Sequence, residues 1–415
     1  MSMSYPIDKL GKHIQILSGF AFKSKDFSDA GIPVIKIKNV TPPSVSLIDL
    51  SYVSEEVANQ NSKFILQYDD VLIALTGSHI NQMASVVGRV ARVKYLDVTV
   101  LNQRVAKITV IDENDCDLDF VYYYLSQDKT KIELASKAGG AANQANISPT
   151  DIKNLMIPFP NIKTQRKISS VLKSYDDLIE NNQKQIKLLE EVAQRLYKEW
   201  FVDLRFSGYE NTPIIDGTPQ GWKEYAISDL CEKINAGGTP SRRNANYWND
   251  ASIKWYKTQE LQDCWLIDSD EKISKEGQEN SSAKFFPKNT ILMAIYASPT
   301  LGRLGILDSE ATCNQAALCL KADETIISWQ WLYEKLYELR DHYNGIARGA
   351  GQQNISGEVV KQTIVLCPTK EIIDKFTQIV APWFEKRRVL KKQNASLIEA
   401  RDRLLPKLMS GELEV

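Results

Sequence analysis

An internal repeat constrains the fold of this chain more than any other feature of its sequence. Residues Gln144–Ser148 read QANIS and residues Gln352–Ser356 read QQNIS, at an offset of 208 residues (354 minus 146 for the shared asparagine). The same offset continues without a gap through proline, aromatic and leucine positions: Pro160 and Pro368, Ile168 and Phe376, Tyr175 and Trp383, Leu189 and Leu397, Leu196 and Leu404. A chain of 415 residues that repeats itself in this way predicts two related domains, each large enough to bury its own core.

Each half also shows the same order of predicted elements before the shared motif. An apolar, strand-like run is followed by a polar loop, an Asn-Gln pair precedes another apolar strand, and a helix-like segment runs into a Gly-rich loop. The paired segments are 71–77 and 291–297, Asn102-Gln103 and Asn314-Gln315, and 118–137 and 328–347. This order predicts an α+β fold with a pseudo-two-fold repeat, because it lacks the regular alternation of a doubly wound parallel sheet.

A long amphipathic helix is predicted at the end of each half. Glycine and proline are absent from Thr164 to Phe201, a stretch that forms a helix about 57 Å long at 1.5 Å per residue. Its apolar stripe is wider than a two-stranded coiled coil requires, so we expect contacts with more than one partner. The predicted packing and partner-binding residues are Ile168, Leu172, Tyr175, Ile179, Ile186, Leu189, Leu196 and Trp200 in the first helix, and Phe376, Trp383, Leu390, Leu397 and Leu404 in the second. We expect the two helices to pair in antiparallel fashion, and Pro382 to kink or delay the second.

Composition and motifs exclude several classes of protein. The six cysteines form no Cys-x-x-Cys pair and the three histidines (His13, His79 and His342) lie far apart, so no metal site is expected. The sequence has no apolar run of membrane-spanning length and no amino-terminal signal segment, which predicts a cytoplasmic protein without membrane contact. It also lacks an Asn/Asp-Pro-Pro-Tyr/Phe methyl-transfer motif, a P-loop and a persuasive nuclease carboxylate cluster, so no catalytic residue is predicted.

Net charge does not indicate a nucleic-acid partner. The formal net charge is −1, whereas most free-standing DNA-binding proteins are clearly basic, because phosphate contacts supply much of their affinity. DNA binding would require basic residues confined to one face, or cationic surface supplied by partner subunits.

Short motifs nevertheless resemble a known family of DNA-reading proteins. Pro219–Lys223 reads PQGWK, Gly237–Arg242 reads GGTPSR, and Leu404–Leu413 reads LLPKLMSGEL. Together with the Gly-rich loops and the repeated motif, they resemble the specificity subunits of Type I restriction–modification enzymes. The first half opens with Gly19–Lys23 (GFAFK), a variant that is also common in that family. The resemblance covers essentially the whole chain.

The resemblance implies a protein without a catalytic site that directs adenine methylation and restriction. Each half would read one part of a bipartite, asymmetric site on double-stranded DNA. The long helices would set the unread gap and hold two methyltransferase subunits, which recruit motor–nuclease subunits. The implied domains are target recognition domains at 1–160 and 207–368 and spacer helices at 161–206 and 369–415. S-adenosylmethionine, ATP and Mg²⁺ are expected only on the partner subunits, so this chain is predicted to bind no cofactor.

Base-reading residues are expected in loops that follow strands, where polar and basic side chains can reach base edges. In the first half the predicted DNA-binding residues are Lys23, Lys25, Ser78, His79, Asn81, Gln82, Gln103 and Arg104. In the second half they are Thr239, Ser241, Arg242, Arg243, Tyr296, Ser298 and Arg303. An ordinary polar turn is the alternative at each position. The repeated Gln144/Asn146 and Gln352/Asn354 are predicted to be structural, capping the next segment, with phosphate contact as the alternative.

Two other functions remain open on the sequence alone. One is a DNA-modifying enzyme whose catalytic residues are of an unrecognised type. The other is a duplicated coiled-coil scaffold that binds only protein. The basic cluster within 386–392 (Lys386, Arg387, Arg388, Lys391 and Lys392) is interpreted as a solvated helix face, with DNA or an acidic partner as the alternative.

Overall fold

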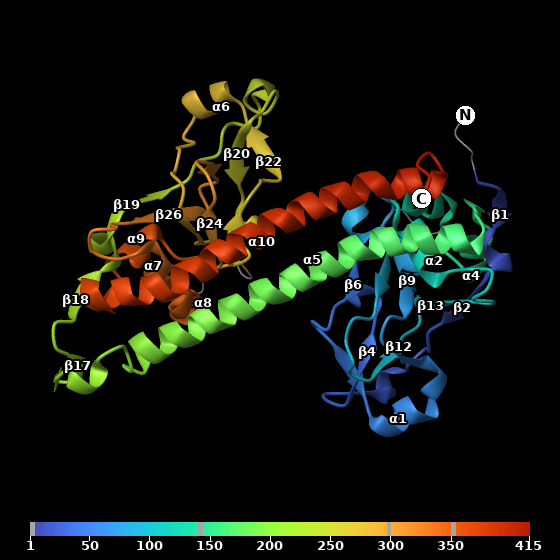
Figure 1. Cartoon of the computed structure of the whole chain (residues 1–415), viewed down its shortest axis with the longest axis horizontal. Helices are drawn as coiled ribbons and strands as arrows, with labels where there is room; N and C mark the ends of the chain where they lie inside the picture. The colour runs from blue at the N-terminus through green and yellow to red at the C-terminus, as the bar shows by residue number, and fades with distance from the viewer. Residues whose placement is uncertain (1–4, 140–143, 297–299, 350–353) are drawn as a thin grey trace. The chain divides into compact units, whose positions relative to one another are not determined.

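The chain forms two compact units in the computed structural model, which describes residues 5–139, 144–296, 300–349 and 354–415 (Figure 1). The first unit comprises Met1–Leu178 and Leu397–Val415, and the second comprises Ile179–Ser396. Each unit therefore contains one recognition half together with part of both long helices, α5 (Ile162–Tyr197) and α10 (Lys370–Ser410). The predicted α+β fold with an internal repeat is confirmed.

The first unit is built on two mixed sheets. A six-stranded sheet has the order β2-β13-β9-β11-β6-β5, and a five-stranded sheet has the order β3-β7-β4-β12-β8. The strands are β2 (Ile14–Ser18), β3 (Phe27–Ser28), β4 (Ile32–Ile35), β5 (Val40–Thr41), β6 (Ser44–Val45), β7 (Ser51–Val53), β8 (Ile65–Leu66), β9 (Val71–Ala74), β11 (Val90–Arg92), β12 (Thr99–Leu101) and β13 (Val105–Val110). Two short pairs join β1 (Ile7–Lys9) to β15 (Met156–Pro158) and β10 (Thr76–Gly77) to β14 (Ala145–Asn146). The shorter helices are α1 (Glu55–Gln60), α2 (Leu118–Ser126), α3 (Asp128–Lys137) and α4 (Pro149–Lys153).

The second unit repeats the central strand order. Its five-stranded sheet runs β19-β26-β23-β24-β21, so that β19-β26-β23-β24 corresponds to β2-β13-β9-β11 of the first unit. A three-stranded sheet, β22-β20-β25, and the pairs β18-β27 and β16-β17 complete it. The strands are β16 (Ile214–Ile215), β17 (Thr218–Pro219), β18 (Lys223–Ala226), β19 (Cys231–Ala236), β20 (Ile253–Tyr256), β21 (Cys264–Leu266), β22 (Glu271–Ile273), β23 (Ile291–Ala294), β24 (Leu304–Leu307), β25 (Thr312–Cys313), β26 (Ala317–Ala322) and β27 (Ile364–Cys367). The helices are α6 (Lys275–Glu279), α7 (Trp329–Glu338), α8 (Arg340–Gly349) and α9 (Gly357–Gln362).

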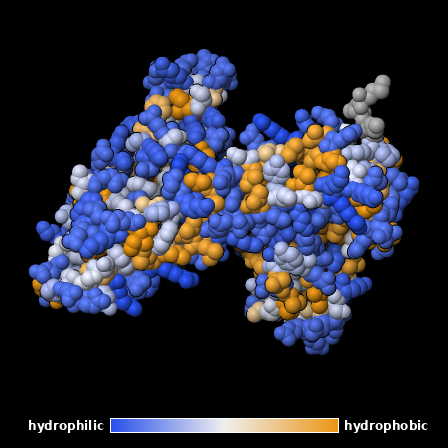
Figure 2. Space-filling view, viewed as in Figure 1, coloured by the Kyte–Doolittle hydropathy of each residue, from blue (hydrophilic) through white to orange (hydrophobic). Residues whose placement is uncertain are grey.

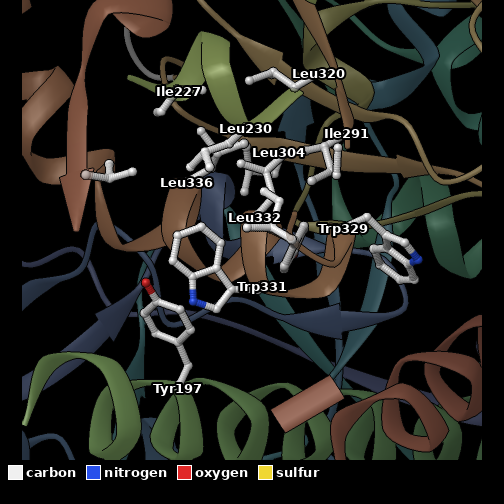
Figure 3. Packing of buried hydrophobic residues seen from close by; sticks show 14 of the residues in the cluster. Tyr197, Ile227, Leu230, Ile291, Leu304, Leu320, Trp329, Trp331, Leu332 and Leu336 are labelled. Atoms are coloured by element: carbon white, nitrogen blue, oxygen red, sulfur yellow. The ribbon is translucent and has the colours of Figure 1, made fainter. Parts of the chain in front are cut away.

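Helix α7 packs between the sheet of the second unit and the long helix α5. The hydroxyl of Ser328 caps α7 by accepting a hydrogen bond from the Trp331 backbone N–H at 3.2 Å. Trp331 is fully buried, and Figure 3 shows it between Tyr197 on α5 and the strand residues Leu304 and Leu320. The core of the second unit therefore extends from its sheet onto α5.

The long helices pair in antiparallel fashion within each unit, as predicted. In the second unit, the Asn182 side chain contacts Asn394 and Glu190 contacts Arg387, so the residue number on α10 falls as that on α5 rises. In the first unit, Arg401 donates to Asp176 at 2.7 Å. The predicted delay at Pro382 is wrong, because α10 begins at Lys370 and continues through that proline. Buried Phe376, Val380 and Phe384 on either side of Pro382 pack into the core and offset the lost backbone hydrogen bond.

A buried asparagine pair lies on the helix pair of the second unit. Asn182 and Asn394 are 7% and 5% exposed, and the Asn182 Nδ2 donates to Asn394 Oδ1 at 2.9 Å. A buried amide is satisfied only where its partner stands opposite, so the pair specifies one alignment of the two helices.

We expect Asn394→Ala to destabilise the second unit by about 1–3 kcal/mol, because it leaves the Asn182 amide buried without its partner. The double variant Asn182→Leu/Asn394→Leu should recover most of that loss, since two apolar groups replace the whole pair. A double-mutant cycle on the denaturation midpoint measures the coupling. Strictly additive effects of the two substitutions would contradict this account.

The basic cluster 386–392 is not a solvated face. Arg387 is 2% exposed and lies 3.4 Å from Glu190, while Arg388 and Lys392 each lie 2.8 Å from Asp308. The interpretation from sequence is wrong here because the acidic partners lie on other elements and turn part of the cluster inward.

Glu334 on α7 is also buried, and burial raises the pKa of its carboxyl to about 8. The folded state therefore holds a proton that the unfolded state loses near pH 4.5, and folding takes up a proton between these two values. The free energy of unfolding of the second unit should fall as pH rises from about 4.5 to about 8, by up to about 1.4 kcal/mol per pH unit.

Glu334→Gln should reduce this slope, because glutamine does not titrate, while other buried carboxyls of the unit with a raised pKa, such as Glu190, keep their contribution. Denaturation midpoints at several pH values between about 5 and 8 check the prediction, with the exposed Glu279→Gln as the control that keeps the wild-type slope. Equal slopes for wild type and Glu334→Gln would rule out Glu334 as their source.

Candidate DNA interface

Three segments meet at the end of the central strand in the first unit. The Leu75 backbone N–H, just beyond β9, donates to Arg104 O at 2.8 Å, and the Ile147 N–H donates to Leu75 O at 3.0 Å. Thr76 in β10 also pairs with Asn146 in β14. The loop after β9, the turn at Asn102-Gln103 (the Asn-Gln turn) and the repeated motif at 144–148 are thus brought together.

The second unit repeats these backbone contacts with different side chains. The Ile295 N–H donates to Ala316 O at 3.0 Å, and the Ile355 N–H donates to Ile295 O at 3.0 Å. By these contacts Tyr296 occupies the position of Thr76, and Ala316 that of Arg104. A shared backbone frame with unlike side chains is an arrangement suited to reading two different targets.

Glycines let the opening segment of each half approach its Asn-Gln turn closely. A Cβ atom at Gly19 would lie 2.2 Å from Asn102 O, and one at Gly237 would lie 2.4 Å from Asn314 O. The openings GFAFK and GGTPSR therefore place their following residues near the turns. Lys23 and Lys25 are exposed, Lys23 directly before a short helical turn (Ser24–Asp26) and Lys25 within it.

In the first unit the polar cluster consists of Thr76, Arg104 and Asn146. Arg104 Nη1 lies 3.3 Å from Thr76 Oγ1 and 3.2 Å from Asn146 Oδ1, and the Thr76 hydroxyl donates to Asn146 Oδ1 at 2.7 Å. Gln103 is exposed beside them. The predicted capping role belongs to Ser148 rather than Asn146, because the Ser148 hydroxyl accepts from the Asp151 N–H at the start of α4.

The predicted loop after β10 is closed by its own hydrogen bonds. The Ser78 hydroxyl donates to Gln82 O at 2.7 Å and Ser85 donates to Ser78 at 3.0 Å, so Ser78 holds the loop together. Asn81 and Gln82 are exposed, and His79 is half-buried. The loop therefore presents Asn81 and Gln82 to solvent, while Ser78 has an internal role.

In the second unit the predicted residues fall into two groups. Thr239 hydrogen-bonds to Gln315, which presents an exposed amide at the Asn-Gln turn. Arg242 instead stacks 3.6 Å above the Trp248 ring and lies 2.5 Å from Glu271, and its hydrogen bond lowers the pKa of Glu271. The Arg242 side chain thus contacts Trp248 and Glu271 of the protein itself. Thr239 instead holds the Gln315 side chain in place.

The remaining predicted residues of the second unit lie at its surface. Ser241, Arg243 and Tyr296 are exposed, and Arg303 is half-buried after the left-handed Gly302. Ser298 lies outside the described residues, as does Gln352.

Sequence reasoning missed Arg89 and Gln315. Arg89 follows Gly88 as Arg303 follows Gly302, and both pairs come before a strand, β11 and β24. Arg89 donates to Ala84 O at 3.0 Å and to Ile37 O at 3.4 Å, and burial lowers the pKa of its guanidinium. The recurring Gly-Arg and Asn-Gln pairs were the signals that could have identified both residues.

The predicted helix residues differ in burial. Ile168, Leu172, Ile179, Trp200, Phe376 and Leu390 are buried, whereas Tyr175, Ile186, Leu189, Leu196, Trp383, Leu397 and Leu404 are half-buried. Figure 2 shows a surface that is mainly hydrophilic, with separate apolar patches. Large apolar side chains are exposed on α5 at Val171 and Leu178 in the first unit, and at Leu188 and Val192 in the second.

Within the described residues, no group of three or more His, Cys, Asp and Glu side chains is arranged to hold a metal ion. Among the helices of that same part of the chain, none has the length and apolar character needed to cross a bilayer.

A duplicated α+β chain, whose halves carry equivalent loop clusters with unlike side chains, is organised as a two-domain recognition protein. The model of the family described as Type I restriction modification DNA specificity domain matches residues 8–191 and again residues 219–397. The chain belongs to this family and carries two copies of its domain, and the assignment as a DNA specificity subunit made from sequence motifs is confirmed.

Named relatives agree with this assignment. The chain is 28% identical to the Type I restriction enzyme MjaIX specificity subunit of Methanocaldococcus jannaschii, over 71% of this chain and 68% of that protein. It is 25% identical to the Type I restriction enzyme HindI specificity subunit of Haemophilus influenzae, over 63% of this chain and 70% of that protein. The crystal structure of the S subunit of a Type I restriction–modification system from M. genitalium has the same fold, with a TM-score of 0.60, 16% identity and coverage of 98% of this chain and 96% of that one.

Proposed function

We propose that each half of the chain reads one half of a bipartite, asymmetric site on double-stranded DNA. The observation that carries this proposal is the repeated backbone frame with unlike side chains, Thr76 and Arg104 in one half and Tyr296 and Ala316 in the other. Two equivalent docking frames suit two half-sites, and different side chains suit two different sequences.

The paired helices α5 and α10 would set the unread gap between the half-sites. The buried Asn182–Asn394 pair supports this role, because it favours a single alignment of the two helices. Recognition of half-sites about one helical turn of DNA apart, about 34 Å, is the expected geometry.

Partner subunits would supply the chemistry. Exposed apolar side chains on α5 support docking of partner helices, at Val171 and Leu178 in the first unit and at Leu188 and Val192 in the second. The proposed partners are two methyltransferase subunits, which bring S-adenosylmethionine, and motor–nuclease subunits, which bring ATP and Mg²⁺. The chain itself would be a non-catalytic, cytoplasmic subunit, and its partners would add the basic surface that a net charge of −1 lacks.

Methylation mapping of host DNA with and without the gene tests this proposal. The expected result is the loss of one adenine mark within a bipartite sequence that has two unlike half-sites. An unchanged methylome, with the partner subunits expressed, would overturn the proposal and favour a protein-binding scaffold. Methyl transfer by the isolated chain with S-adenosylmethionine and DNA would instead favour an enzyme.

A further inference from the structure

Arg104 is an exposed arginine that the protein holds in place. Its Nη1 contacts the oxygens of Thr76 and Asn146 at 3.3 and 3.2 Å. The Thr76 hydroxyl hydrogen is directed at Asn146, 2.7 Å away, so both oxygens accept from the guanidinium. An arginine that is already held loses less conformational freedom when it binds a ligand.

The backbone at Arg104 is in the left-handed region, with φ of 70°. The turn itself does not require this conformation. In the first half the turn closes with a hydrogen bond from the Val105 N–H to Asn102 O at 3.2 Å, and the equivalent turn in the second half closes with one from the Ala317 N–H to Asn314 O, also at 3.2 Å. Ala316, at the position of Arg104, is nevertheless outside the left-handed region. Arg104 thus adopts a backbone conformation that is unfavourable for a non-glycine residue, although the turn does not require it. This favours a functional role for Arg104.

The edge that this cluster presents consists of hydrogen-bond donors. Among the described residues no carboxylate forms an ion pair with Arg104, and only its Nη1 has a hydrogen-bond partner there. The Asn146 Oδ1 is occupied by Thr76 and Arg104, which leaves its Nδ2 as a donor. In the major groove guanine offers two adjacent acceptors, O6 and N7, whereas adenine offers one acceptor beside a donor.

We propose that Arg104 reads a guanine in the half-site bound by the first half, and that Thr76 and Asn146 are positioning residues for it. This inference rests on the proposed function and adds the identity of one base. The second half has Tyr296 and Ala316 at the equivalent positions, so it lacks this particular contact.

The test uses the complex with its methyltransferase subunits and duplexes of the mapped site. Each guanine of the first half-site is replaced in turn by 7-deazaguanine, which lacks the N7 acceptor. At one position the wild-type complex should bind about tenfold more weakly, as expected for the loss of part of a bidentate contact. Arg104→Ala should bind natural DNA more weakly and show no further loss on the modified duplex.

Positioning is tested by Asn146→Ala, which keeps the arginine but removes one of its supports. It should reduce the ratio of affinities for natural and modified DNA, while Arg166→Ala should keep the wild-type ratio. Arg166 is a matched control because it is an exposed arginine of the first unit that donates to Glu113 O at 2.8 Å, away from the cluster.

Several outcomes would overturn the assignment of Arg104 as a guanine contact. They would not affect the proposal that the two halves read a bipartite site, because methylation mapping tests that proposal separately. A first half-site without guanine is one, and a wild-type complex indifferent to every 7-deazaguanine substitution is another. A third is an Arg104→Ala variant that weakens binding equally for all sequences and lowers its salt dependence, which would make Arg104 a phosphate contact.

Discussion

Arg387→Ala is expected to destabilise the second unit by about 3–5 kcal/mol, because it removes one partner of the buried ion pair between Arg387 and Glu190. The Arg387 guanidinium is buried on α10, 3.4 Å from the Glu190 carboxylate of α5, and its Nη2 donates to Asp263 O at 3.2 Å. Without it, the carboxyl of Glu190 stays in an environment where burial already raises its pKa. The expected result is a lower denaturation midpoint for the unit.

Tryptophan fluorescence reports this transition selectively, because all eight tryptophans of the chain lie between residues 179 and 396. Arg195→Ala is the control: Arg195 is an exposed arginine of α5 within the second unit, and its loss should leave the midpoint nearly unchanged. Adding Glu190→Gln to Arg387→Ala should recover part of the stability, since it removes the unpaired charge. A midpoint for Arg387→Ala equal to that of wild type would contradict the assigned burial.

Trp331→Ala should cost the second unit about 3–5 kcal/mol through the cavity it leaves. Trp331 is fully buried in α7, and its ring meets that of Phe201 edge-on at 6.2 Å between centroids. For a unit of this size, the loss corresponds to a melting temperature lowered by roughly 10 °C.

Thermal unfolding, followed by the fluorescence of the seven other tryptophans, measures the effect. Tyr209→Ala, at a residue 41% exposed, should leave the melting temperature nearly unchanged. Trp331→Phe should recover part of the loss, because a smaller ring refills some of the cavity. A shift for Trp331→Ala no larger than that for Tyr209→Ala would show that α7 does not support the core as described.

The repeat and the long helices could be predicted because their signals are local. The run Val71–Ala74 is apolar at every position and forms a wholly buried strand, as does Ile291–Ala294. The stretch without glycine or proline that begins near Thr164 forms a helix, because no residue in it interrupts the backbone hydrogen bonds. This signal, too, is local.

The burial of Arg387 and the engagement of Arg242 could not be predicted, because their partners are distant in sequence. Arg387 meets Glu190 on the other long helix, and Arg242 meets Glu271 on β22. A basic residue looks the same in sequence whether it faces DNA, solvent or a buried carboxylate. The Asn-Gln turns were visible as repeats, but the contacts from Thr76 to Arg104 and from Thr239 to Gln315 depend on how the segments cross.

Binding to a panel of duplexes tests most directly whether the two halves read two half-sites at a fixed spacing. The panel carries the mapped site intact, with either half-site scrambled at three base pairs, or with one base pair added to or removed from the gap. The complex should bind the intact site tightly and lose at least about 100-fold on each scrambled half-site, since each mismatch costs about 1–3 kcal/mol. It should also lose affinity on both altered gaps, because one base pair rotates a half-site by about 34–36°. Equal affinity for the intact site and for either single half-site, or indifference to the gap, would contradict the account.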